Sequence, residues 1–301
     1  MNIKNEVRQF YNQVGWQLVD EDSYQNTRYE DLRPVSYEYI HRCHMRIIEH
    51  IKPVGRYMLD AGSGPIQYPE YLLYSRGFQY RVCADISIKA LTEARKRIGD
   101  HGLFAVADIA ALPFKPDIFD GIVSLHTIHH LPKEEHLQAY KELYRVLAPN
   151  CSAALVNAWP NSPLMNFFNP LIRLANRIRS LNKKMPSQNL PNRIENATSE
   201  NGTSKNTQIE SSHEPLPKGT FTARNNVAWL INEVGGRMAI EIWVWRCVSV
   251  RFLRALIHPR LGGRFWLRMI FWLEERFPHF LGCRGQYPLI IVRKQSEASR
   301  I

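Results

Sequence analysis

One segment, residues 57–120, constrains the fold of this chain more than any other. An apolar run ends in a turn at 60–64 that reads Asp-Ala-Gly-Ser-Gly, and the next two apolar runs end on Asp85 and Asp108. Glycines at 62 and 64 remove the side chains that would block both a sharp strand-to-helix turn and a bulky ligand against it. The amide groups of the turn and the N-terminus of the following helix would face that ligand. The pattern predicts a site for a nucleoside with a charged tail.

The turn distinguishes between two classes of nucleoside ligand. A dinucleotide site needs Gly-x-Gly-x-x-Gly, but Gln67 stands at the third glycine position, which disfavours a nicotinamide dehydrogenase. Asp60 also lies inside the turn, where it would repel a pyrophosphate. A carboxylate there suits a cation, such as the amine of an amino-acid tail.

Five motifs in order resemble the class I S-adenosylmethionine-dependent methyltransferases, and the resemblance covers roughly 59–156. Among these enzymes it is nearest to small-molecule methyltransferases, the type that includes quinone-biosynthesis C-methyltransferases. The resemblance implies S-adenosyl-L-methionine as the cofactor. The motifs lie at 59–64, 83–87, 106–114, 119–126 and 143–149.

The resemblance also implies roles for the carboxylates. The acid at the end of the second motif, Asp85, would hold the ribose hydroxyls, and Asp108 would meet the adenine amine. The expected cofactor-binding residues are Asp60, Gly62, Gly64, Asp85, Ile86, Asp108, Ile109 and Leu125. Two positions depart from the family. Pro65 replaces a small residue, and Asn150 begins the turn in place of glycine, where asparagine tolerates left-handed backbone.

Strand-like runs alternate with helix-like runs through the centre of the chain, which predicts an α/β protein with a parallel, doubly wound sheet. Ligands of such sheets bind at the carboxyl ends of the strands, where the three aspartates and His126 are expected. The resemblance implies a Rossmann-like sheet of seven strands, closed by an antiparallel pair. The expected strands are 56–60, 80–85, 103–107, 119–125, 153–156, 238–245 and 287–292.

The rest of the chain is predicted to surround this domain. Residues 1–50 form a helical cap, 51–160 and 218–295 form the methyltransferase domain, and 161–217 form an insertion. Within the insertion, 186–217 has almost no large apolar residues, so it is predicted to be disordered. Residues 246–285 form a second, aromatic and basic insertion between the last two strands.

Candidate catalytic residues follow the fourth strand. Methyl transfer needs an aligned acceptor, and a base where the acceptor is not already anionic. His126 is favoured because it stands nearest the strand end, with His129 and His130 as alternatives; each could instead be a loop or capping histidine. Tyr29 and Arg33 share a helix face in the cap and are candidate substrate contacts. No cysteine or carboxylate has the spacing of a metal site with these histidines.

The net positive charge of the chain bears on which partners it could attract. The formal net charge is +11, and from Glu241 onward eleven Lys/Arg face four Asp/Glu. Such an excess attracts anionic lipid, nucleic acid or a phosphorylated substrate, although it can also be only a solvated surface. The helix predicted around 264–277 could dock into the core, cover a substrate as a lid, or lie in a membrane interface through Trp266, Phe271 and Trp272.

The sequence therefore predicts an enzyme that methylates a small-molecule or lipid-linked acceptor. An RNA methyltransferase would explain the charge, but no RNA-binding module is recognisable, so nucleic acid is not expected as a partner. A catalytically silent S-adenosylmethionine-binding protein at membrane surfaces is the other alternative. No secretion signal, disulfide pattern or membrane-spanning run is evident, which predicts a cytoplasmic protein with at most peripheral contact to the inner membrane surface.

Overall fold

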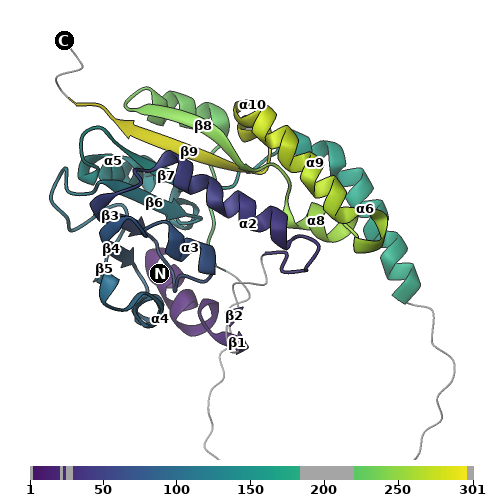
Figure 1. The fold of residues 1–301 in the computed structure, drawn as a ribbon, viewed down its shortest axis with the longest axis horizontal. Helices are drawn as coiled ribbons and strands as arrows, with labels where there is room; N and C mark the ends of the chain where they lie inside the picture. Colours follow the sequence, from purple (N-terminus) through teal and green to yellow (C-terminus); the bar gives the residue numbers. More distant parts are fainter. Residues whose placement is uncertain (1–2, 21–22, 25–29, 184–219, 297–301) are drawn as a thin grey trace, which may run out of the picture.

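The computed structural model describes residues 3–20, 23–24, 30–183 and 220–296. A seven-stranded sheet in the order β5-β4-β3-β6-β7-β9-β8 forms its centre (Figure 1). Six strands run in one direction, and β9 runs antiparallel to them between β7 and β8. The predicted doubly wound sheet and its antiparallel pair are therefore confirmed. The strands are β3 (Gly55–Ala61), β4 (Phe78–Asp85), β5 (Gly102–Val106), β6 (Gly121–Leu125), β7 (Cys151–Val156), β8 (Ala239–Arg246) and β9 (Tyr287–Lys294).

Helices bury both faces of this sheet, which explains why its central strands read as continuous apolar runs. All six residues of β7 are buried. One face packs against α5 (His136–Val146) and η7 (Leu230–Gly235), with Leu143 and Val234 in its core. The other face packs against α3 (Pro69–Leu73) and α4 (Ile88–Ile98), with Tyr71 and Leu91 in its core.

Two local features follow from the chemistry of single residues. Ser87 caps α4, and its hydroxyl accepts a hydrogen bond from the N–H of Ala90 at 3.2 Å. Asn150 has φ = 60°, so asparagine supports the left-handed turn before β7 as predicted. Shorter turns complete the sheet domain: η4 (Gly99–His101), η5 (Ile128–His130), η6 (Lys133–Glu135) and α7 (Val227–Trp229).

The N-terminal region is helical apart from one short pair of strands. It contains α1 (Ile3–Phe10), η1 (Tyr11–Gly15), β1 (Leu18–Asp20), β2 (Ser23–Tyr24), α2 (Tyr37–Met45) and η3 (Arg46–His50). We call α1 and η1, together with Trp16, the N-terminal cap. In Figure 1 the cap lies beside α4, and η1 contacts that helix.

The described parts of the two predicted insertions form one helical bundle past the end of β8 (Figure 1). The bundle shares a buried apolar core with α2, built around Tyr39, Phe252, Leu253 and Leu267. The region 186–217, predicted to be disordered, lies outside the described residues. No helix among the described residues is both long and apolar enough to cross a bilayer. The bundle helices are α6 (Pro163–Lys183), α8 (Val250–Leu256), η8 (Pro259–Leu261), α9 (Gly263–Arg276) and α10 (Pro278–Arg284).

A buried polar network joins α9 to α2 and to the end of β8. The Glu274 carboxylate is fully buried and accepts hydrogen bonds from the Tyr39 hydroxyl at 2.7 Å and the Cys247 N–H at 2.6 Å. It also pairs with Arg46 at 3.0 Å. These bonds fix the bundle to the sheet domain at the point where the chain leaves β8.

Candidate functional site

The glycine turn after β3 has the close contacts that its sequence predicts. Gly62 and Gly64 have φ values of 73° and 56°, in the left-handed region. A Cβ atom at Gly62 would lie 2.2 Å from the side chain of Thr127, and one at Gly64 would lie 3.1 Å from the Trp16 ring. The turn therefore requires glycine at both positions, for conformation and for space.

Asp85 lies at the carboxyl end of β4 and is bonded to this turn. Its carboxylate accepts the Gly64 N–H at 2.9 Å and the Ser87 N–H at 2.8 Å. Burial raises the pKa of Asp85 to about 6, although both N–H groups act to lower it. Each carboxylate oxygen keeps a further lone pair, so Asp85 can still accept hydrogen bonds from two ribose hydroxyls.

The pKa of Asp85 predicts how cofactor binding depends on pH. Protonation converts the carboxylate into a group that no longer accepts two charge-assisted bonds. The affinity for S-adenosylmethionine should be full above pH 6 and should fall as the pH drops through 6, by up to about tenfold per pH unit. Calorimetry between pH 5 and 7 measures this dependence. A wild-type affinity that stays constant over this range would contradict the ribose assignment.

Asp60 has a partner that the sequence interpretation did not anticipate. Its carboxylate is buried and forms an ion pair with Arg81 of β4, whose Nε lies 3.1 Å away. Burial raises the pKa of Asp60, while Arg81 acts to lower it. The negative charge of Asp60 is thus balanced inside the protein, and its contact with a cofactor amine stays a prediction. The sequence feature that could have predicted this pair is Arg81, an arginine within a mostly apolar strand.

Asp108 follows β5 and also forms an ion pair with a cationic side chain of the protein. One carboxylate oxygen accepts the Ala110 N–H at 2.9 Å, and the other pairs with Lys4 of α1. Lys4 also pairs with Glu135. An adenine amine bound at Asp108 would therefore share this carboxylate with Lys4. The neighbouring Ile109 is buried, which fits the apolar wall expected beside an adenine ring.

The N-terminal cap covers the residues predicted to bind the cofactor. Besides the Lys4 pair, Asn12 accepts a hydrogen bond from the Ser87 hydroxyl at 2.6 Å. The Trp16 ring lies over Gly64 and stacks on Tyr11 with 5.0 Å between ring centroids. Lys4, Asn12 and Trp16 are thus neighbours of the site that the sequence alone did not assign to it.

The three candidate histidines lie beyond β6, in different environments. His126 has φ = 56°, and its ring packs edge-on against Trp245 and Tyr287. In His130 the Nδ1 donates to the Phe221 carbonyl at 2.9 Å, so Nε2 accepts from the Tyr11 hydroxyl at 2.8 Å. Both His130 nitrogens are occupied, which argues against His130 as a catalytic base.

Burial also weakens the basicity of these histidines. It lowers the pKa of His126 to about 3, aided by the nearby Arg246, and that of His130 to about 4. The pKa of His129 is lowered well below its ordinary value by burial and by the neighbouring histidines. All three rings are neutral at pH 7, and none is a strong base there.

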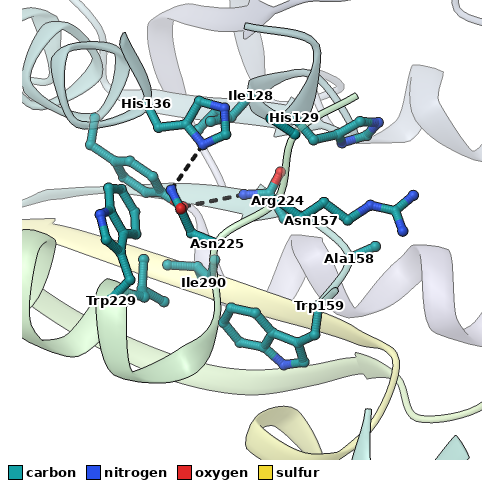
Figure 2. Close-up of a pocket in the computed structure, with 13 residues that line it drawn as sticks. Ile128, His129, His136, Asn157, Ala158, Trp159, Arg224, Asn225, Trp229 and Ile290 are labelled. Carbon is teal, nitrogen blue, oxygen red and sulfur yellow. Dashed lines mark hydrogen bonds between the residues drawn. The ribbon is translucent and has the colours of Figure 1, made fainter. Parts of the chain in front are cut away.

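A pocket opens beside His129, where the segment after residue 220 crosses the end of the sheet (Figure 2). His136 donates from Nε2 to the Leu131 carbonyl at 3.1 Å, so its Nδ1 accepts from the Asn225 amide at 2.9 Å. Asn157 donates to the Tyr140 hydroxyl at 3.2 Å on the same wall. His136, Asn157 and Tyr140 are thus bonded within the wall, and we assign no base to this pocket.

Of the two predicted substrate contacts in the N-terminal region, the structure describes only one. Tyr29 lies outside the described residues. The Arg33 guanidinium binds Asp31 at 2.7 Å through two nitrogens and donates to the Leu253 and Ile257 carbonyls at the end of α8. Arg33 therefore joins this part of the chain to the helical bundle, and its contact with a substrate stays a prediction.

Comparisons with known proteins agree with this architecture. Residues 59–155 match the family model described as a methyltransferase domain. Methyltransferase GfsG of Streptomyces halstedii is 31% identical over 108 residues, which are 34% of this chain and 38% of that protein. The chain thus covers less than two fifths of the length of this curated relative.

One solved structure shares the fold at low sequence identity. Phosphoethanolamine N-methyltransferase 1 of Haemonchus contortus, in complex with phosphoethanolamine and S-adenosylhomocysteine, superposes with a TM-score of 0.54 at 10% identity. The match covers 99% of this chain and 51% of that protein. Since the sequence identity is low, this likeness concerns the fold alone.

Proposed function

We propose that this chain, whose residues 59–155 form a class I S-adenosylmethionine-dependent methyltransferase domain, transfers a methyl group to a small-molecule or lipid-linked acceptor. The observation that supports this function most is the glycine turn bonded to Asp85 at the carboxyl edge of the sheet. S-adenosylmethionine, when bound, supplies an electrophilic methyl group on a sulfonium. The acceptor forms its new bond to that carbon as the carbon–sulfur bond breaks, and S-adenosylhomocysteine leaves.

The residues of this chain would act mainly by binding and alignment. Asp85 and Asp108 hold the nucleoside, and the N-terminal cap shields the site from water. His126 lies on the acceptor side, beyond β6, beside Trp245 and Tyr287. Because its pKa is low, His126 is better suited to orient an acceptor than to deprotonate one at neutral pH.

This function is tested by following methyl transfer into cell extract. Purified protein is incubated with methyl-labelled S-adenosylmethionine and an extract of metabolites and lipids, and labelled products are identified by mass spectrometry. We expect a labelled product with the wild type and its loss with Asp85→Asn. Tight S-adenosylmethionine binding with no labelled product would favour the catalytically silent alternative, whereas label in RNA would favour the RNA methyltransferase.

A second proposal is that the bundle contacts an anionic membrane surface. One face of α9 and α10 is apolar and exposed, and we call it the α9–α10 face. The exposed arginines Arg264, Arg276 and Arg284 lie on the same two helices, and the exposed Arg260 lies in the preceding η8. Apolar burial and attraction to anionic headgroups would act together on such a surface. The α9–α10 face comprises Phe265, Trp266, Met269, Trp272 and Phe280, which are 60%, 53%, 40%, 61% and 56% exposed.

The structure corrects one residue of the predicted membrane contact. Phe271 is buried against α2, with the Arg42 guanidinium 3.7 Å from its ring centroid. α9 thus packs into the core with one side and exposes an apolar face on the opposite side. Leu267, Phe271 and Glu274 pack inward, and Trp266 and Trp272 point outward.

The membrane proposal predicts binding to lipid vesicles. The wild type should co-sediment with vesicles of phosphatidylglycerol and phosphatidylcholine, and salt should release part of it. Each indole would bury roughly 100 Å² at about 25 cal/mol per Å², so Trp266→Ser with Trp272→Ser should weaken binding on the order of 100-fold or more. The matched control is Val54→Ser with Ile88→Ser, which are exposed apolar residues elsewhere. Wild type that stays in the supernatant, or equal losses in both double variants, would contradict the proposal.

A further inference from the structure

A buried group of aromatic and charged side chains lies beside His126. It comprises Glu30, His44, Trp245, Arg246 and Tyr287, and we call it the Trp245 cluster. Arg246 ends β8, which runs parallel to β7 because both pair antiparallel to β9. The cluster therefore lies at the carboxyl edge of the sheet, where Arg246 is in register with Tyr287.

Contacts within the cluster are close. The Arg246 guanidinium lies 4.7 Å from the Tyr287 ring centroid and 5.3 Å from that of Trp245, and it pairs with Glu30 at 2.6 Å. His44 of α2 stacks on Trp245 with 5.4 Å between centroids and 14° between planes. His126 touches the same two rings as Arg246, with centroid distances of 5.2 Å to Trp245 and 5.6 Å to Tyr287. The cluster is thus contiguous with the acceptor side of the proposed site.

Several polar atoms of the cluster are buried without a hydrogen-bond partner among the described residues. They are Trp245 Nε1, Arg246 Nε and both ring nitrogens of His44. These three side chains are 1%, 2% and 1% exposed. The carboxylate oxygen of Glu70 nearest to His44 is 3.8 Å from Nδ1, beyond hydrogen-bond distance. Since buried polar groups are almost always paired, these four atoms are available to a polar ligand.

The chemistry of these atoms defines that ligand. Trp245 Nε1 and Arg246 Nε can only donate, and a neutral imidazole adds one donor and one acceptor. The cluster thus offers three donors and one acceptor, so a matching ligand is rich in oxygen acceptors. The aromatic rings of Trp245, Tyr287 and His44 favour a planar body for it.

We propose that the Trp245 cluster binds the methyl acceptor and that this acceptor is an aromatic oxyanion, such as a carboxylate or a phenolate. This inference rests on the proposed methyltransferase function. An acceptor that is already anionic needs no strong base, which agrees with the weakly basic His126 beside the cluster. Glu30 pairs with the Arg246 guanidinium through Nη1 and balances its charge, while Nε stays available as a donor to the ligand.

Calorimetry with the full chain tests this proposal, with benzoate as the probe and benzylamine as the cation of similar shape. S-adenosylhomocysteine is titrated first, and the probes are then added to the saturated protein. Benzoate should bind more tightly than benzylamine. Trp245→Phe and His44→Phe, which keep a ring and remove the N–H groups, should each weaken benzoate binding by roughly tenfold. Trp243→Phe is the matched control, because Trp243 Nε1 donates to Glu241 at 2.9 Å, outside the cluster.

The outcomes distinguish a failure of the acceptor proposal from a failure of the proposed function. Benzylamine binding as tightly as benzoate, unchanged benzoate affinity in both cluster variants, or no benzoate binding to the wild type would each overturn the proposal. Absence of S-adenosylhomocysteine binding would instead overturn the proposed function. Thermal melting checks the fold, and Trp245→Phe should not unfold the protein, because it removes a buried donor that lacks a partner.

Discussion

Replacing Asp85 with alanine is expected to weaken S-adenosylmethionine binding about 100-fold or more while the protein stays folded. The wild-type carboxylate would accept two charge-assisted bonds from the ribose hydroxyls, each worth about 1.5–3 kcal/mol. The variant also releases the Gly64 N–H, which holds the glycine turn in place. Calorimetry measures the affinity, and circular dichroism checks the fold.

Asp100→Ala is the control for this loss, because Asp100 is an exposed carboxylate in η4. Its removal should leave the affinity unchanged. A folded Asp85→Ala protein with wild-type affinity would show that another group holds the ribose. Tight NAD binding by the wild type would contradict the assignment of the cofactor.

Replacing Glu274 with alanine is expected to lower the free energy of unfolding by about 3–5 kcal/mol, because it breaks a buried ion pair and leaves Arg46 partly uncompensated. The Tyr39 hydroxyl and the Cys247 N–H would also lose their acceptor. Urea unfolding, followed by fluorescence, measures the change.

Glu275→Ala provides a matched comparison on the same helix. Glu275 also pairs with Arg46, at 2.7 Å, but its side chain is 50% exposed. An exposed ion pair contributes about 0–1 kcal/mol, so this variant should unfold close to the wild type. Equal destabilisation by the two variants would show that the buried network does not fix the bundle to the sheet domain.

The sequence predicted those parts of the molecule that depend on local patterns. The glycine turn and the left-handed Asn150 each involve a few consecutive residues, and both are present as expected. The seven-stranded sheet with its antiparallel pair came from the resemblance. The positions of Asp85 and Asp108 at the same edge followed from the parallel direction of the strands that they follow.

What the sequence could not predict depends on residues far apart in the chain. Glu274 reads as one of two charges on a surface helix, yet it is fully buried because Arg46 lies opposite it. Arg33 shares a predicted helix face with Tyr29, but α8 supplies carbonyls that bind it. In the Trp245 cluster, His44 comes from α2, and Trp245 and Arg246 come from β8, which the fold alone brings together with α2.

In the proposed enzyme, the N-terminal cap would make the lifetime of the bound cofactor depend on the first sixteen residues. Lys4, Asn12 and Trp16 contact Asp108, Ser87 and Gly64, which surround the proposed nucleoside site. For spent cofactor to leave, these contacts must separate, and such opening motions often limit enzyme turnover. Dissociation of S-adenosylhomocysteine, rather than the chemical step, would then set the pace of the reaction. A fusion tag joined directly to α1 would alter that pace without touching any residue of the sheet.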